Sequence, residues 1–149
     1  MEYDRIIKIL NTERIGGGEE SLEITTRGAL QGDANDYSLS YYEHLGAGLD
    51  CTTRIHVKDK RFVSIMRQGA INSLITMEPG NRHQCIYSTP YGDLPIGVWT
   101  NELSSDIDVH GGELRLKYVV DFDGPIPGQR KNMKITVSDI QQKGSAEND

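Results

Sequence analysis

The chain has 149 residues and a mass of 16.6 kDa, and its 22 acidic side chains outnumber 16 basic ones to give a formal net charge of −6. This length suits one domain that buries a core without disulfides or a structural metal. No apolar run approaches the roughly 20 residues of a membrane-spanning helix, and the first residues are acidic where a secretory signal would be basic, so we expect a soluble, cytoplasmic protein.

Charge and cysteine content narrow the classes of partner and cofactor. Basic residues are scattered through an acidic chain, so duplex nucleic acid is a poor candidate partner unless the fold assembles a local basic patch. Cys51 and Cys85 lie 34 positions apart without a Cys-x-x-Cys pair, which favours free thiols. No metal is predicted, because the four histidines fall on separate segments: His44, His56, His83 and His110. No cofactor is predicted either, because the glycine run at 16–18 lacks the Lys-Ser/Thr of a P-loop and the strand-to-helix context of a dinucleotide site.

Alternation of apolar and polar residues predicts strands along the whole chain. Residues 21–30 and 49–58 show the period of two that places one face on a core and the other in water, and residues 113–122 and 133–138 repeat it. About ten strands are expected, some of them short or merged, from eleven spans: 3–11, 20–31, 36–44, 49–58, 61–68, 72–78, 82–89, 93–100, 103–110, 112–122 and 130–140.

The breaks between these spans are short and rich in turn residues. Gaps of two to five residues permit only antiparallel neighbours, because a parallel crossover needs a dozen or more residues. Since an open sheet of this size exposes its edges, the predicted fold is an all-β, closed antiparallel meander barrel of about 8–10 strands. We expect one barrel domain over residues 1–140 and a disordered C-terminal tail over residues 141–149.

Four segments resemble the YwiB-like family of small bacterial β-barrel proteins. They are Leu39-Ser40-Tyr41-Tyr42-Glu43, residues 48–55, residues 65–69, and residues 87–100, where Thr89-Pro90-Tyr91-Gly92 is the most specific element. The resemblance covers nearly the whole chain. It implies a closed, lipocalin-like (calycin) barrel from the cytoplasm of Gram-positive bacteria, in a family without an assigned function.

Glu43 and Arg67 are the side chains that could carry chemistry inside a barrel. Glu43 shares strand parity with Tyr37, Leu39 and Tyr41, and Arg67 shares parity with Val63 and Ile65, so both are expected to point inward. Two interpretations stay open: an internal ion pair that fills one end of the barrel, or a cavity where arginine and tyrosines hold a carboxylate or phosphate head. Phe62 and Met66 have the opposite parity to Arg67, and in the alternative assignment they point into the core and Arg67 points outward.

Aromatic residues near position 90 have two interpretations each. Pro90-Tyr91-Gly92 is typical of a tight hairpin, with Tyr91 as an alternative contact at the rim of a cavity. Trp99 is a packing residue or part of an outer patch used in self-association, for example in a homodimer. The predicted ligand-binding residues are Tyr41, Glu43, Thr53, Arg67 and Tyr91.

Three functions follow from this pattern. We favour a non-catalytic barrel that binds a small amphipathic or anionic ligand in or at its mouth, because eight-stranded barrels can enclose one small ligand. An enzyme would use Glu43 as a general base, with Arg67 or Tyr41 stabilising negative charge, and would need Glu43 poorly paired. A structural or protein-interaction barrel would fill its lumen with Tyr37, Leu39 and Tyr41.

Overall fold

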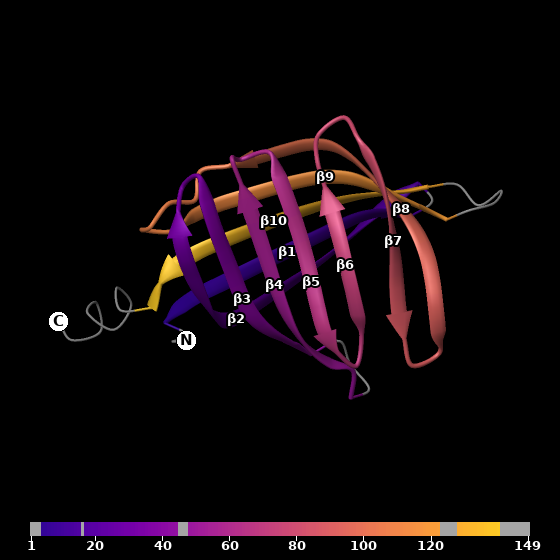
Figure 1. The fold of residues 1–149 in the computed structure, drawn as a ribbon, viewed down its shortest axis with the longest axis horizontal. Coiled ribbons are helices and arrows are strands. Elements are labelled where there is room, and N and C mark those ends of the chain that lie inside the picture. The colour runs from indigo at the N-terminus through magenta and orange to yellow at the C-terminus, as the bar shows by residue number, and fades with distance from the viewer. Residues whose placement is uncertain (1–3, 16, 45–47, 123–127, 141–149) are drawn as a thin grey trace.

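The computed structural model describes residues 4–15, 17–44, 48–122 and 128–140, and it forms a closed barrel of ten antiparallel strands (Figure 1). Each strand pairs with its sequence neighbours and β1 pairs with β10, so the predicted meander is confirmed. The tail expected over residues 141–149 lies outside the described residues. The strands are β1 (Arg5–Ile15), β2 (Gly18–Asp33), β3 (Asp36–His44), β4 (Asp50–Lys58), β5 (Phe62–Gly69), β6 (Asn72–Met77), β7 (Arg82–Thr89), β8 (Gly92–Ser105), β9 (Gly112–Phe122) and β10 (Gln129–Asp139).

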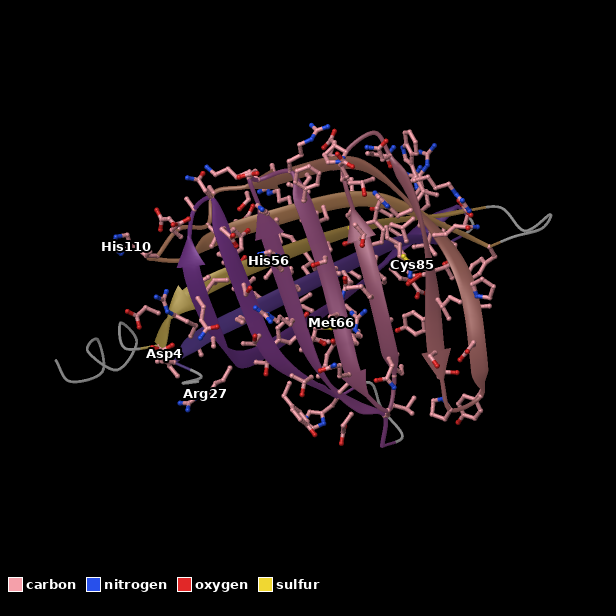
Figure 2. The ribbon with its side chains drawn as sticks, in the orientation of Figure 1. Asp4, Arg27, His56, Met66, Cys85 and His110 are labelled. Carbon is pink, nitrogen blue, oxygen red and sulfur yellow. The ribbon has the colours of Figure 1, made fainter. Side chains whose placement is uncertain are left out.

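The barrel is flattened into two layers. In Figure 1, β3 to β7 run across the front, and β1, β9 and β10 cross behind them at a steep angle. Side chains alternate between the lumen and the outside, so His56 and Met66, labelled in Figure 2, belong to the outer faces of β4 and β5. Within the described ranges, no helix is long and apolar enough to cross a membrane.

The separate strands expected at 93–100 and 103–110 are wrong, because one continuous strand, β8, covers Gly92–Ser105. A β-bulge between Thr100 and Glu102 inserts one extra residue opposite β9. Val98 and Thr100 face the lumen before the bulge, and Leu103 takes the inward position after it. The change of parity breaks the sequence pattern although the strand continues, and residues 106–110 belong to a turn.

One end of the barrel, which we call the packed end, is filled with side chains. It carries the connections β2–β3, β4–β5, β6–β7 and β8–β9. Ile107, in the β8–β9 connection, is 0% exposed. The Tyr37 hydroxyl and Ser105 Oγ share a hydrogen bond of 2.7 Å. The buried residues that meet there include Ile7, Tyr37, Leu39, Ile55, Val57, Val63, Met77 and Leu114.

Pairing around the barrel is weakest between β6 and β7. Only two residue pairs join these strands, Asn72 with Ser88 and Ser73 with Tyr87. The loop after β6 pairs with β8 instead, since the Gly80 N–H donates to the Thr100 carbonyl at 2.9 Å. The barrel therefore closes through a short seam beside the site described next.

Candidate functional site

The opposite end of the barrel, which we call the hollow end, encloses a cavity of about 690 Å³. Its walls come from inward-facing residues near the β1–β2, β3–β4, β5–β6, β7–β8 and β9–β10 connections. The charged lining residues are Glu13, Glu20, Glu43, Arg67 and Lys131. Most of the wall is apolar and includes Ile24, Ile75, Ile96, Val98, Phe122 and Met133.

A belt of polar side chains crosses the inner wall at one level. Residues opposite each other on paired strands share a face, and the register pairs Tyr41 with Thr53, Thr53 with Arg67, Arg67 with Ser73, and Ser73 with Tyr87. Because Tyr41 and Thr53 are fully buried, the whole belt faces the lumen. Five strands, β3 to β7, therefore contribute one polar side chain each to a single ring segment.

Glu43 and Arg67 form a mostly buried ion pair beside this belt. Arg67 Nε donates to Glu43 Oε1 at 3.1 Å, and the two side chains are 13% and 9% exposed, respectively. Thr53 Oγ1 donates a hydrogen bond to the same carboxylate oxygen. Both side chains point inward as predicted, whereas Phe62 lies on the outer face, 42% exposed.

Burial and the Glu43–Arg67 pair together set the electrostatics of the belt. Burial is the largest single influence on Arg67 and disfavours its charge, but the Glu43 carboxylate together with Tyr41 and Tyr87 outweighs this cost, so the pKa of Arg67 is raised. Burial raises the pKa of Tyr118 to about 12, although the nearby Arg67 charge opposes that shift. Burial and the Glu43 carboxylate raise the pKa of Tyr41 above its usual range. The tyrosine hydroxyls therefore stay neutral at physiological pH and can both donate and accept hydrogen bonds.

Two side chains of the belt have hydrogen-bond donors that no described protein group accepts from. Among the described residues, Arg67 donates only through Nε, so its two terminal nitrogens carry no protein hydrogen bond. Ser73 Oγ is buried without a partner in the same part of the structure. A buried hydroxyl that lacks a hydrogen bond is costly, and a guanidinium with an open edge is suited to a planar anion. This arrangement can accept an acidic group.

The other predicted site residues are placed differently. Thr53 is fully buried and positions Glu43 through its hydrogen bond. Tyr91 is 90% exposed in the β7–β8 turn and lies outside the cavity lining, where its N–H donates to Thr89 Oγ1 at 3.1 Å. The hairpin interpretation of this turn therefore fits the structure, and the rim contact does not.

Sequence reasoning missed part of the lining. Tyr87 and Tyr118 both line the cavity, and Ser73 completes the belt. The available signal was a tyrosine in an otherwise aliphatic inward set, since Tyr118 shares strand parity with Leu114 and Leu116. Near the cavity mouth, Lys131 Nζ lies 3.7 Å from Glu13 Oε1, an ion pair that joins two strands distant in sequence.

The arrangement gives little support to metal or base chemistry. No cluster of three or more His, Cys, Asp or Glu residues in the described part of the chain could hold a metal ion. Glu43 is held by two hydrogen bonds on one oxygen, so it lacks the poorly paired state that the general-base hypothesis needs.

Comparisons with known proteins identify similar barrels. The profile of a domain of unknown function, DUF1934, matches residues 7–135. The uncharacterized beta-barrel protein YwiB of Bacillus subtilis (strain 168) is 28% identical over 102 residues, which cover 68% of this chain and 70% of that protein. The crystal structure of ywiB protein from Bacillus subtilis superposes with a TM-score of 0.75 at 24% identity and covers 92% of each chain. This structural likeness supports the β-barrel fold.

Proposed function

The chain belongs to the DUF1934 family of unknown function, and we propose that it binds one small amphipathic molecule with a carboxylate head inside the hollow end of its barrel. The observation that carries this proposal is a cavity of about 690 Å³ whose apolar walls reach the Glu43–Arg67 pair. Small-molecule sites typically enclose about 300–1,000 Å³ and combine apolar walls with a few polar groups that fix orientation.

The polar belt favours an acidic head. The terminal nitrogens of Arg67 match the two oxygens of a carboxylate, and the hydroxyls of Tyr87 and Tyr118 can donate further hydrogen bonds beside it. Three carboxylates and two cations line the cavity. A doubly charged phosphate would meet more repulsion from this lining than a singly charged carboxylate, so the carboxylate is the preferred head.

The walls favour an aliphatic body. Ile75, Ile96 and Val98 come from three different strands and line the cavity together with Phe122 and Met133. Each CH₂ group transferred from water to such a wall contributes about 0.8 kcal/mol. Most of the binding free energy would therefore come from the chain of the ligand, and Arg67 would select its head.

We also propose that the protein works in a reducing, cytoplasmic compartment. Cys51 and Cys85 are both free and buried. Burial raises the pKa of the Cys51 thiol, and the nearby Glu43 carboxylate raises it further, which keeps the thiol protonated and unreactive.

A thermal-shift screen against dodecanoate, dodecanol and dodecyl phosphate tests the ligand proposal. Dodecanoate should raise Tm the most in the wild type, and Arg67→Met should remove this preference over dodecanol. Arg54→Met is the matched control, because Arg54 lies on the outer face of β4. Native mass spectrometry should show one bound molecule per chain. A wild type that binds none of the three compounds, or a preference for dodecanoate that survives in Arg67→Met, contradicts the proposal.

A further inference from the structure

The outer wall formed by β1, β10 and β9 is positively charged, in contrast to the acidic chain as a whole. Alternation places six cations on this wall: Lys8, Arg14, Arg115, Lys117, Arg130 and Lys134. Only two carboxylates, Glu113 and Asp121, share the outer face of these three strands. On these three strands six cations less two carboxylates leave an excess of four positive charges, in a chain whose formal net charge is −6. Two carboxylates of the flanking strands border this wall, Glu19 opposite Arg14 and Glu102 opposite Lys117, and reduce the excess to two. The fold therefore assembles a basic patch that the linear sequence does not show.

Most of these cations have no carboxylate partner. Lys117 Nζ lies 3.4 Å from Glu102 Oε2, and Arg115 pairs with Glu113. The other four make no ion pair with any residue that the structure describes. Arg115 and Lys134 stand directly opposite each other on paired strands, where like charges repel. An anion bound to this wall would relieve that repulsion.

The patch is hollowed toward one side and has an aromatic neighbour. A surface groove of about 480 Å³ has a mostly basic and amide lining, which includes one carboxylate: Arg14, Lys117, Arg130, Lys131, Asn101, Asn132 and Glu19. The register places Trp99 next to Val119 and Val119 next to Arg130, so one row across β8, β9 and β10 runs from an indole to a guanidinium. Trp99 is 40% exposed on this outer face.

We propose that this wall binds single-stranded nucleic acid, with phosphates along the basic stripe and a base stacked on Trp99. From Lys8 to Arg14 the stripe is roughly 20 Å long at about 3.3 Å per residue, enough for several nucleotides. Proteins that bind single strands combine a basic groove with an exposed aromatic ring. A duplex keeps its bases paired and offers Trp99 nothing to stack on, so the single strand is the preferred partner.

Fluorescence measurements test this proposal with the intact protein. A labelled 12-nucleotide oligo(U) should raise anisotropy, and the slope of log K against log salt concentration should be close to −3, about −0.7 for each of four neutralised phosphates. Trp99 is the single tryptophan of the chain, so quenching of its emission reports stacking directly. Binding should be weaker for a 12-base-pair duplex and should survive in Arg67→Met, which separates this proposal from that for the cavity.

Two double variants with the same change of charge provide the control. Lys117→Glu with Arg130→Glu should weaken oligo(U) binding more than about tenfold. Arg54→Glu with Lys58→Glu alters the outer face of β4, on a different part of the barrel. At 0.15 M salt, where distant charges are largely screened, this variant should bind oligo(U) within about twofold of the wild type. Equal losses in the two variants, tighter binding of the duplex, unchanged Trp99 emission at saturation, or no binding at low salt would each overturn the proposal.

Discussion

The two ends of the barrel are built from the same ten strands but hold different contents. At the packed end, Tyr37 and Leu39 of β3 and Ile107 of the β8–β9 connection are buried in the hydrophobic core. At the hollow end, Arg67 and Glu43 lie beside a cavity of about 690 Å³. The packed end can supply the cooperativity of folding, and the hollow end can then carry polar groups that a close-packed core would not accommodate.

The two ends should differ most in how much stability is lost when one isoleucine at each end is truncated. Ile107→Ala should lower the free energy of unfolding by about 3 kcal/mol, because it leaves a cavity among fully buried neighbours. Ile75→Ala removes the same atoms from a wall that already borders a cavity and should cost about 1 kcal/mol. Urea denaturation measures both variants. Similar losses would mean that the hollow end contributes to stability as much as the packed end.

A double-mutant cycle measures how strongly Glu43 and Arg67 stabilise each other at the hollow end. Glu43→Gln keeps an oxygen for the Thr53 hydrogen bond, and Arg67→Met keeps the length of the side chain. We expect each single change to destabilise, with a coupling free energy of about 2 kcal/mol, because either change leaves a mostly buried charge without its partner. A coupling close to zero would show that water in the cavity solvates both charges.

Added volume should be tolerated at one end only. Val57→Phe at the packed end should cost about 1.5 kcal/mol, since the extra atoms meet a close-packed core. Val98→Phe places the same atoms next to the cavity and should leave the free energy of unfolding nearly unchanged while it prevents dodecanoate binding. Thermal denaturation and the ligand screen together check this pair. A large loss in Val98→Phe would mean that the hollow end is as tightly packed as the other.

The smallest effect concerns alkaline pH. Burial raises the pKa of Tyr37 and of Tyr118 to about 12, from an ordinary value of 10.0. A raised pKa in the folded state means that the protonated tyrosine stabilises the fold below pH 10, and that this contribution is lost as the pH rises from 10 to 12. Tyr37→Phe and Tyr118→Phe should each flatten the fall in stability across that interval. The ultraviolet absorbance of tyrosinate follows the titration. Deprotonation of all seven tyrosines of the chain near pH 10 would contradict the raised pKa values.

Much of the fold could be predicted because its cause is local. Alternation along a strand and short turns are enough to specify an antiparallel meander, and a sheet of that size closes to hide its edges. The bulge in β8 was missed because it is a property of pairing: Asn101 is an ordinary polar residue, and only its position opposite β9 makes it the extra one.

The site could be predicted only in part for a related reason. Parity with Leu39 and Ile65 shows that Glu43 and Arg67 point inward, but parity does not say at which height along the barrel they meet. Register decides that height, and it also brings Ser73 and Tyr87 beside Arg67. Tyr91 was predicted as a contact at the rim of the cavity, but the β7–β8 turn places its side chain in solvent.

The short seam between β6 and β7 has a consequence for motion. Eleven residue pairs join β1 to β2, but only two join β6 to β7. Separating β6 from β7 therefore breaks few backbone hydrogen bonds, and amide protons on their facing edges should exchange with deuterium well before those of β1. We expect local opening of the barrel to begin at this seam, where the polar belt crosses it, so that the residues proposed to bind the ligand include residues that move.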